Sequence, residues 1–321
     1  MEVYNASPST TILEEVISLY EETLQHRPLG HGGRADTLQD LGDALSQFCR
    51  AHQSDEMRCN LSVSLFREAL VLRPVGTPSR DVTLLSLGIV LLFARFEHHS
   101  GGQDDLTESV ALCREAVQLR PPGHPARIKS LSNQAVGLWH LFEHYGDLEA
   151  LAQSTKIHRE VLQLAPEGHP RHMHALTNLG VLLRRTFDHQ GGFEMLTEAI
   201  SLYRAALEIC PVSDTDCFMA LDNLANALWA SFGHHGDPEA LSEAISLHHH
   251  ALEAVPAMHP QRARIMTSLA DTLLADFREQ GQSHSLREAI ILFREALVLQ
   301  PVGNPLRTYT CLLYTSPSPR D

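Results

Sequence analysis

Residues 176–211 read LTNLGVLLRRTFDHQGGFEMLTEAISLYRAALEICP, and this stretch decides the fold. In its first half, Leu176, Gly180 and Leu183 lie three or four residues apart, which places them on one face of a helix. A Gly-Gly turn follows, and a second run of apolar residues with the same spacing ends at Pro211. The stretch therefore predicts two amphipathic helices joined by a short turn, each with an apolar face that needs a neighbour.

A proline closes such an apolar run at intervals of 45 to 47 residues along the whole chain. These prolines are Pro28, Pro74, Pro121, Pro166, Pro211, Pro256 and Pro301. A glycine follows most of them after two residues, and a His, Thr, Asp or Asn comes one residue later, as expected for a loop that leads into a new helix. Self-similarity at a fixed period of this length is the signature of a repeat array.

Other positions keep step with the prolines. Leucine or methionine lies ten residues after each of the first six prolines, and leucine lies seventeen after it. Between them is a column of small residues, which comprises Gly42, Gly88, Ala135, Gly180, Ala225 and Ala270. Glycine inside a helix costs about 1 kcal/mol relative to alanine, so its recurrence predicts that another helix approaches closely there.

We predict an all-α array of helix–turn–helix units over residues 12–307, because two helices cannot bury their apolar faces without stacked neighbours. A half unit at 12–28 precedes units at 28–74, 74–121, 121–166, 166–211, 211–256 and 256–301. We expect residues 1–11 to be disordered. The non-repeat tail at 308–321 ends in YTSPSPRD, which cannot continue a helix and resembles translated sequencing-adapter sequence. Our hypothesis is an array truncated near residue 308, and a natural tail is the alternative.

The columns resemble a known repeat family. Leu179-Gly180, Leu183, Ala199, Tyr203, Ala206 and Pro211 follow the order of the tetratricopeptide signature. The unit exceeds the motif's length of about 34 residues, with additional residues at both helix junctions. The amino-acid sequence of the unit also resembles the repeats of fungal tetratricopeptide proteins, many of which carry a caspase-like CHAT protease domain after the repeats. The resemblance implies a right-handed α-solenoid that serves as a protein-binding scaffold.

Composition excludes several classes of function. The formal net charge is −14 at pH 7, which argues against nucleic acid and favours basic or neutral partners. No segment is apolar enough for a membrane span, and Met1–Thr11 lacks the features of a signal peptide. Because the six cysteines form no CxxC pair, we interpret them as reduced thiols of a cytoplasmic protein. They are Cys49, Cys59, Cys113, Cys210, Cys217 and Cys311.

The twenty histidines suggest a metal site, but most of them recur once per unit, too far apart for one ion. We interpret them as structural turn residues. His248, His249 and His250 are neighbours on a helix, about 100° apart, and cannot face one metal. His140 and His144 could share an ion, which stays an alternative. No cysteine–histidine pair or glycine-rich phosphate loop is evident, so the sequence predicts no enzyme and no cofactor.

The candidate binding residues lie on the first helices, which the resemblance places along the concave groove of the array. The column before the Leu-Gly position holds Asn133, Asn178 and Asn223, whose amides could bond an extended peptide one unit after another. The alternative is that they bond a neighbouring helix. Six residues further on come Trp139, Arg184 and Trp229, which are either hot-spot residues in the groove or core residues.

Arginines recur near the start of the first helices, where a cation is mildly unfavourable. We expect them to pair with turn acids such as Glu143 or Asp188, and a row of anion sites is the alternative. The sequence predicts a scaffold that binds a peptide or partner protein on its concave face. Two alternatives stay open, the regulatory array of a larger CHAT protease and a metal- or small-molecule-binding protein.

Overall fold

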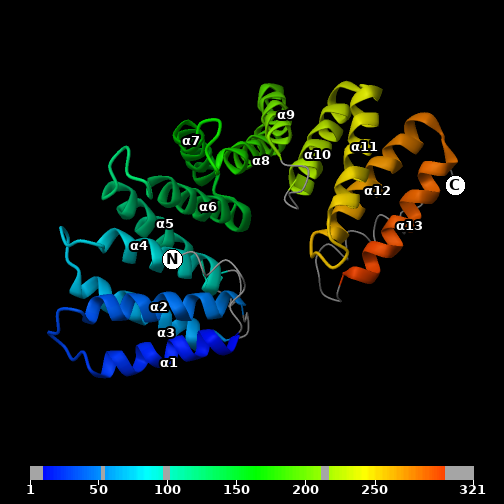
Figure 1. The fold of residues 1–321 in the computed structure, drawn as a ribbon. Helices are drawn as coiled ribbons and strands as arrows, with labels where there is room; N and C mark the ends of the chain where they lie inside the picture. Colours follow the sequence, from blue (N-terminus) through cyan, green and yellow to red (C-terminus); the bar gives the residue numbers. More distant parts are fainter. Residues whose placement is uncertain (1–9, 52–54, 97–101, 211–216, 301–321) are drawn as a thin grey trace. The chain divides into compact units, whose positions relative to one another are not determined.

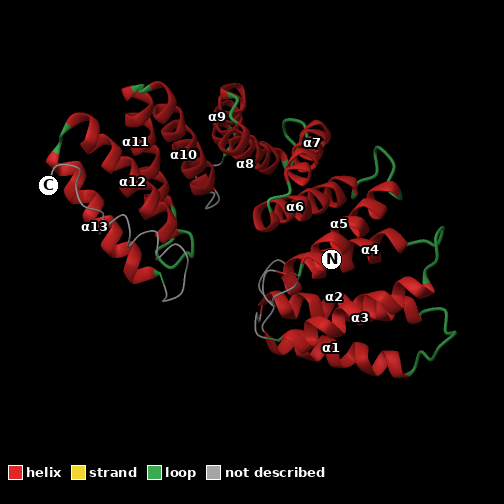
Figure 2. Ribbon diagram, turned by 180° about the vertical axis from the view of Figure 1, so that it is seen from behind, coloured by secondary structure: helices red, strands yellow, loops and turns green. Residues whose placement is uncertain are grey.

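A computed structural model describes residues 10–51, 55–96, 102–210 and 217–300 of the chain. Within these residues every regular element is a helix (Figure 2). The chain divides into two compact units, Met1–Leu164 and Ala165–Asp321, and each is described by itself. The ends of the chain that carry the predicted disordered segment and the non-repeat tail lie largely outside the described residues, although α1 already begins at Thr10.

The first unit consists of seven α-helices and one π-helical segment among its described residues (Figure 1). They are α1 (Thr10–Gln25), α2 (Arg34–Ala51), α3 (Glu56–Leu72), α4 (Arg80–Ile89), η2 (Val90–Phe96), α5 (Gln103–Gln118), α6 (Arg127–Tyr145) and α7 (Leu148–Leu164). The segment η2 continues α4 without a break. Each first helix packs against the second helix of its own repeat, so that the repeat is a helix–turn–helix hairpin.

The second unit has the same construction. Its helices are α8 (His172–Gln190), α9 (Phe193–Glu208), α10 (Cys217–His235), α11 (Pro238–Ala254), α12 (Arg262–Gln280) and α13 (Ser283–Leu299). The closest packing is again within the hairpins α8–α9, α10–α11 and α12–α13. The all-α solenoid class predicted from the repeat columns is therefore confirmed.

The loop between repeats has one conformation wherever glycine follows the proline. Gly30, Gly76, Gly123 and Gly168 have φ between 85° and 92°, a left-handed conformation that favours glycine. One residue later in three of these loops, and at the matching position 259, a histidine turns its ring back onto the chain, whereas Thr77 stands in the fourth loop. The ring Nδ1 of His31, for example, accepts a hydrogen bond of 3.1 Å from the Gly33 amide, and His124, His169 and His259 do the same two residues ahead. These histidines are structural turn residues, as predicted.

The small-residue column marks a close approach between the two helices of a hairpin. A methyl group added to Gly180 would lie 2.7 Å from the ring of Tyr203, which is completely buried. At Gly42 the same addition would meet the ring of Phe66 at 2.7 Å. The opposing residue always stands eight positions before the next proline. The predicted close approach is thus confirmed, and the space is filled by an aromatic ring at Gly180 and Gly42 and by the Cys113 sulfur, 2.9 Å away, at Gly88.

The junctions between repeats use polar packing in the first unit. The buried Arg120 donates from Nη1 to Ser130 Oγ at 2.6 Å and from Nε to Asp81 Oδ2 at 2.7 Å. Arg27 and Arg73 make the equivalent bonds to Thr37 and Thr83. In the second unit the junction that holds Val255 and the fully buried Ile265 is apolar instead, and both residues belong to one core cluster. The same junction between repeats is therefore filled either by an arginine bonded to a hydroxyl group or by two apolar side chains.

The recurring arginines at the start of the first helices pair with other acids than expected. Arg34, Arg80 and Arg127 contact Glu68, Glu115 and Glu160 at 2.7 to 2.9 Å, and each also donates to a carbonyl at the end of the preceding helix. The prediction that these arginines pair with turn acids such as Glu143 or Asp188 was therefore wrong. The turn lies at the far end of the first helix, about 25 Å away for a helix of 19 residues.

The cysteines differ from expectation in one pair. Cys210 and Cys217 form a disulfide, with Cα atoms 6.1 Å apart, between the end of α9 and the start of α10. Their separation of seven residues gives no signal in the sequence, because only the hairpin-to-hairpin junction brings the two helix ends together. Cys49, Cys59 and Cys113 are buried, and burial raises the pKa of the Cys113 thiol to about 12. Cys311 lies outside the described residues.

Candidate binding surface of the first helices

Each unit has two layers of helices (Figure 1). The first helices α4 and α6 contact one another directly, and so do α8 with α10 and α10 with α12. Second helices contact the first helix of the following repeat, as α5 contacts α6 and α9 contacts α10. The first helices of successive repeats are therefore neighbours within each unit. The candidate binding residues all stand on these first helices.

In the first unit, Asn133 and Trp139 lie on α6. The Asn133 side chain is half-buried and donates from Nδ2 to the carbonyl of Lys129 at 2.8 Å, one turn back in its own helix. This bond does not cross to a neighbouring helix, and it leaves the carbonyl oxygen and one N–H of the amide for other partners. The ring of Trp139 is also half-buried and lies 5.7 Å from the ring of Phe142.

In the second unit, Asn178 and Arg184 lie on α8, and Asn223 and Trp229 lie on the adjacent α10. Asn178 is exposed and Asn223 half-buried, and neither side chain bonds any described residue. Arg184 is half-buried and pairs with Asp188, one turn ahead, at 3.3 Å. Trp229 is half-buried. Four candidate residues are thus brought onto two neighbouring helices, with amide groups that the described protein leaves without partners.

The sequence search did not single out an acidic face on α2. Asp36, Asp40 and Asp43 recur at helical spacing, which was the available signal. Asp43 accepts hydrogen bonds of 2.9 Å from Gln39 and Ser86, whereas Asp40 is exposed. Burial of part of its surface, and then the neighbouring charges of Asp43 and Asp36, raise the pKa of Asp40. Asp40 and Asp43 line a small cavity of about 170 Å³ beside α1.

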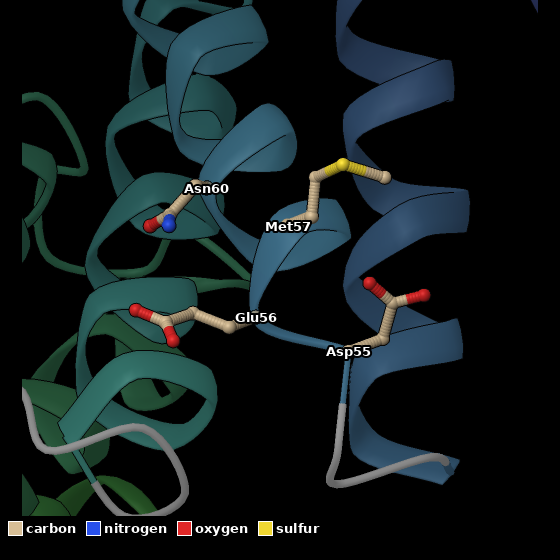
Figure 3. A pocket seen from close by; sticks show the side chains of 4 residues that line it. All are labelled: Asp55, Glu56, Met57 and Asn60. Atoms are coloured by element: carbon tan, nitrogen blue, oxygen red, sulfur yellow. The ribbon is translucent and has the colours of Figure 1, made fainter.

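A second hollow opens at the start of α3, where Asp55, Glu56, Met57 and Asn60 line about 640 Å³ (Figure 3). Asp55 is already used as the N-cap of α3, because it accepts a bond from the Arg58 amide and pairs with the Arg58 side chain. Glu56 and Asn60 point away from Asp55 in the close view. This hollow therefore offers no converging set of ligands.

No metal-binding group of three His, Cys, Asp or Glu side chains occurs among the residues that the structure describes. The rings of His140 and His144 stack with centroids 5.8 Å apart. Every helix in the described ranges of the chain is too short or too polar to cross a bilayer.

Stacked helical hairpins with this loop and this column of small residues define an α-solenoid repeat protein. A family model described as tetratricopeptide repeat matches residues 172–211, which hold α8 and α9. This match confirms, for residues 172–211, the tetratricopeptide-like repeat that the signature residues indicated.

Solved structures support the fold. The nearly identical TPR-like repeats of a Podospora anserina kinesin light chain are similar over 71% of this chain and 97% of that chain, with 16% sequence identity and a TM-score of 0.50. The apo form of the quorum sensor NprR from B. thuringiensis is similar over 95% of this chain and 82% of its own, with 10% identity and a TM-score of 0.52. No curated protein sequence matches this chain.

Proposed function

We propose that this protein is an interaction scaffold whose first-helix layer binds an extended peptide or a segment of a partner protein. The observation that carries the proposal is the pair Asn178 and Asn223, whose amides stand on neighbouring first helices without a partner in the described protein. A side-chain amide can both donate to and accept from a peptide backbone. Successive repeats therefore offer one such contact each.

Arg184 and Trp229 extend this surface. A half-buried tryptophan supplies a flat apolar contact at a small cost in conformational entropy, and an arginine adds a planar donor, which makes both typical hot-spot residues. In the first unit, Asn133 and Trp139 on α6 provide a side-chain amide and an indole ring, as Asn223 and Trp229 do on α10. The net charge of −14 and the acidic face of α2 favour a basic or neutral partner. We assign no reaction to these residues.

A peptide-display selection tests the proposal. Random peptides are selected on the wild-type protein, and the affinities of the enriched peptides are then measured for the double variant Asn178→Ala and Asn223→Ala. We expect the double variant to bind at least tenfold more weakly. Asn60→Ala is the matched control, because the exposed Asn60 lies on the second helix α3, outside the first-helix layer. The proposal would be contradicted if no peptide were enriched, or if the wild type and the double variant bound the enriched peptides with equal affinity.

The alternative of a regulatory array in a larger CHAT protease rests on the wording of the repeats, and no described residue favours it. The coding sequence of the complete gene tests this alternative. A protease domain in the same reading frame would favour a regulatory array over a scaffold that acts alone.

A further inference from the structure

A groove runs along the other helix layer of the first unit, between the second helices α5 and α7. Two adjoining cavities of about 630 and 240 Å³ share Arg114, Glu149 and Gln153 in their walls and so form one continuous hollow. Leu138 and Leu141 of α6 lie at its base, and Ile157 of α7 adds an apolar wall. We call this the α5–α7 groove.

The first feature of the groove is a glutamine side chain. Gln134 on α6 lines it and is 7% exposed, yet its side chain bonds no described residue. In the other five repeats this position is a leucine with an exposure of at most 2%, namely Leu41, Leu87, Leu179, Leu224 and Leu269. The residue is mostly covered, but its amide atoms are not enclosed by the protein and reach the hollow, where a leucine would offer no hydrogen bond. Gln134 therefore offers hydrogen bonds to something that enters the groove.

The second feature is an interrupted row of ion pairs. An arginine on one second helix pairs with a glutamate on the next, as Arg67 with Glu108 at 2.7 Å and Arg204 with Glu243 at 2.8 Å. Arg114 stands in the same arginine column, but Gln153 occupies the glutamate position and donates instead to Glu149. Arg114 consequently has no acidic partner among the described residues, and its exposed side chain lines the groove.

The third feature is an added cation. Lys156 lines the groove, at a column where the other repeats carry Ser64, Ala111, Ser201, Ser246 and Ile291. Of the two acids in the larger cavity, Glu160 already pairs with Arg127 at 2.9 Å and Glu149 accepts from Gln153 at 3.0 Å. In the smaller cavity Asp147 accepts from the Ala150 amide at 3.0 Å, so Arg114 and Lys156 are the cations of the groove that pair with no acid among the described residues.

We propose that the α5–α7 groove binds an acidic peptide segment of a partner protein. Arg114 and Lys156 hold a side-chain carboxylate, Gln134 bonds the peptide backbone, and the apolar side chains Leu138 and Ile157 receive flanking leucine-like residues. The three departures from the repeat pattern fall in one hollow, and each one serves this ligand. The site opens between the second helices α5 and α7, with α6 at its base, and it lies in the other unit from Asn178 and Asn223, so their loss leaves it intact.

The test uses two short capped peptides, Ala-Leu-Glu-Leu-Ala and the same peptide with Gln in place of Glu. Each is titrated to millimolar concentration into the isotope-labelled full chain, and the side-chain NMR signals of Arg114 and Gln134 are followed, assigned by their loss in Arg114→Gln and Gln134→Leu. We expect saturable shifts with the Glu peptide and affinity about tenfold lower for the Gln peptide. Absence of saturable shifts overturns the proposal, as does equal affinity for both peptides.

Two variants restore the repeat pattern and keep the fold. Gln153→Glu gives Arg114 the partner found elsewhere in the row, and Gln134→Leu restores the leucine of the other repeats. Both should weaken binding of the Glu peptide about tenfold, whereas Arg67→Gln, which breaks an intact pair outside the groove, should not change it. Unchanged binding in both restoring variants overturns the proposal. Acetate at the same concentration should not compete, and competition by acetate would reduce the site to a simple anion site and overturn the peptide assignment.

Discussion

The substitution Arg120→Val tests how the junctions between repeats are held together. The Arg120 side chain is only 3% exposed and reaches Ser130, Asp81 and the Ala126 carbonyl. Hydrogen bonds to charged groups contribute roughly 1.5–3 kcal/mol each, and the loss leaves the fully buried Ser130 hydroxyl without this partner. Asp81 is 21% exposed, so water recovers part of its loss. We expect the free energy of unfolding to fall by about 3 kcal/mol.

The double variant Arg120→Val and Ser130→Ile copies the apolar junction of Val255 and Ile265. It removes the orphaned hydroxyl and fills the space, so it should recover about half of the loss, or about 1.5 kcal/mol. Urea unfolding followed by circular dichroism measures both variants, and the m-value must stay constant because repeat arrays can unfold in parts. Arg67→Val, which breaks an exposed pair, should cost at most about 0.5 kcal/mol. Equal costs for Arg67→Val and Arg120→Val would refute this reasoning.

Three further predictions concern other parts of the chain. Gly180→Ala should lower the free energy of unfolding by about 1 kcal/mol, because the clash with Tyr203 exceeds the gain in helix propensity. Gly146 is not a suitable control, because its φ of 69° requires glycine for a different reason. Thermal unfolding measures the change, and a more stable Gly180→Ala variant would contradict the close approach. Burial alone would raise the pKa of Asp222, but the His248 ring at 3.4 Å and the Arg264 charge at 2.7 Å hold it below its usual value. The contribution of Asp222 to stability should therefore be present above about pH 4 and be lost as pH falls through the lowered pKa. Asp222→Asn should flatten this acid dependence of the urea midpoint, and an unchanged slope would count against it. Gln134→Leu should raise stability by about 1 kcal/mol, which chemical denaturation detects, and a lower stability would mean that the Gln134 amide is bonded inside the protein.

Much of the fold could be predicted from the sequence because packing in this array is periodic. The interval between prolines gives the hairpins, and the column of Gly180 gives the close approach to Tyr203, since both depend on spacing along one helix. The acid partners of Arg127 and the Cys210–Cys217 disulfide could not be predicted, because they depend on how far one helix is displaced along its neighbour. Gln134 breaks a leucine column visibly, but only the structure places it beside Arg114.

Photo-crosslinking tests the central claim most directly. A photoreactive benzoylphenylalanine is introduced in place of Asn178 or Asn223 on the first helices, and in place of the exposed Ser201 on the second helix α9 as a control. Each protein is irradiated with a peptide enriched by display on the wild type, and the adducts are quantified by mass spectrometry. Binding along the first-helix layer gives strong adducts at positions 178 and 223 and weak ones at 201. Strong adducts at 201, with none at the two asparagine positions, would contradict it.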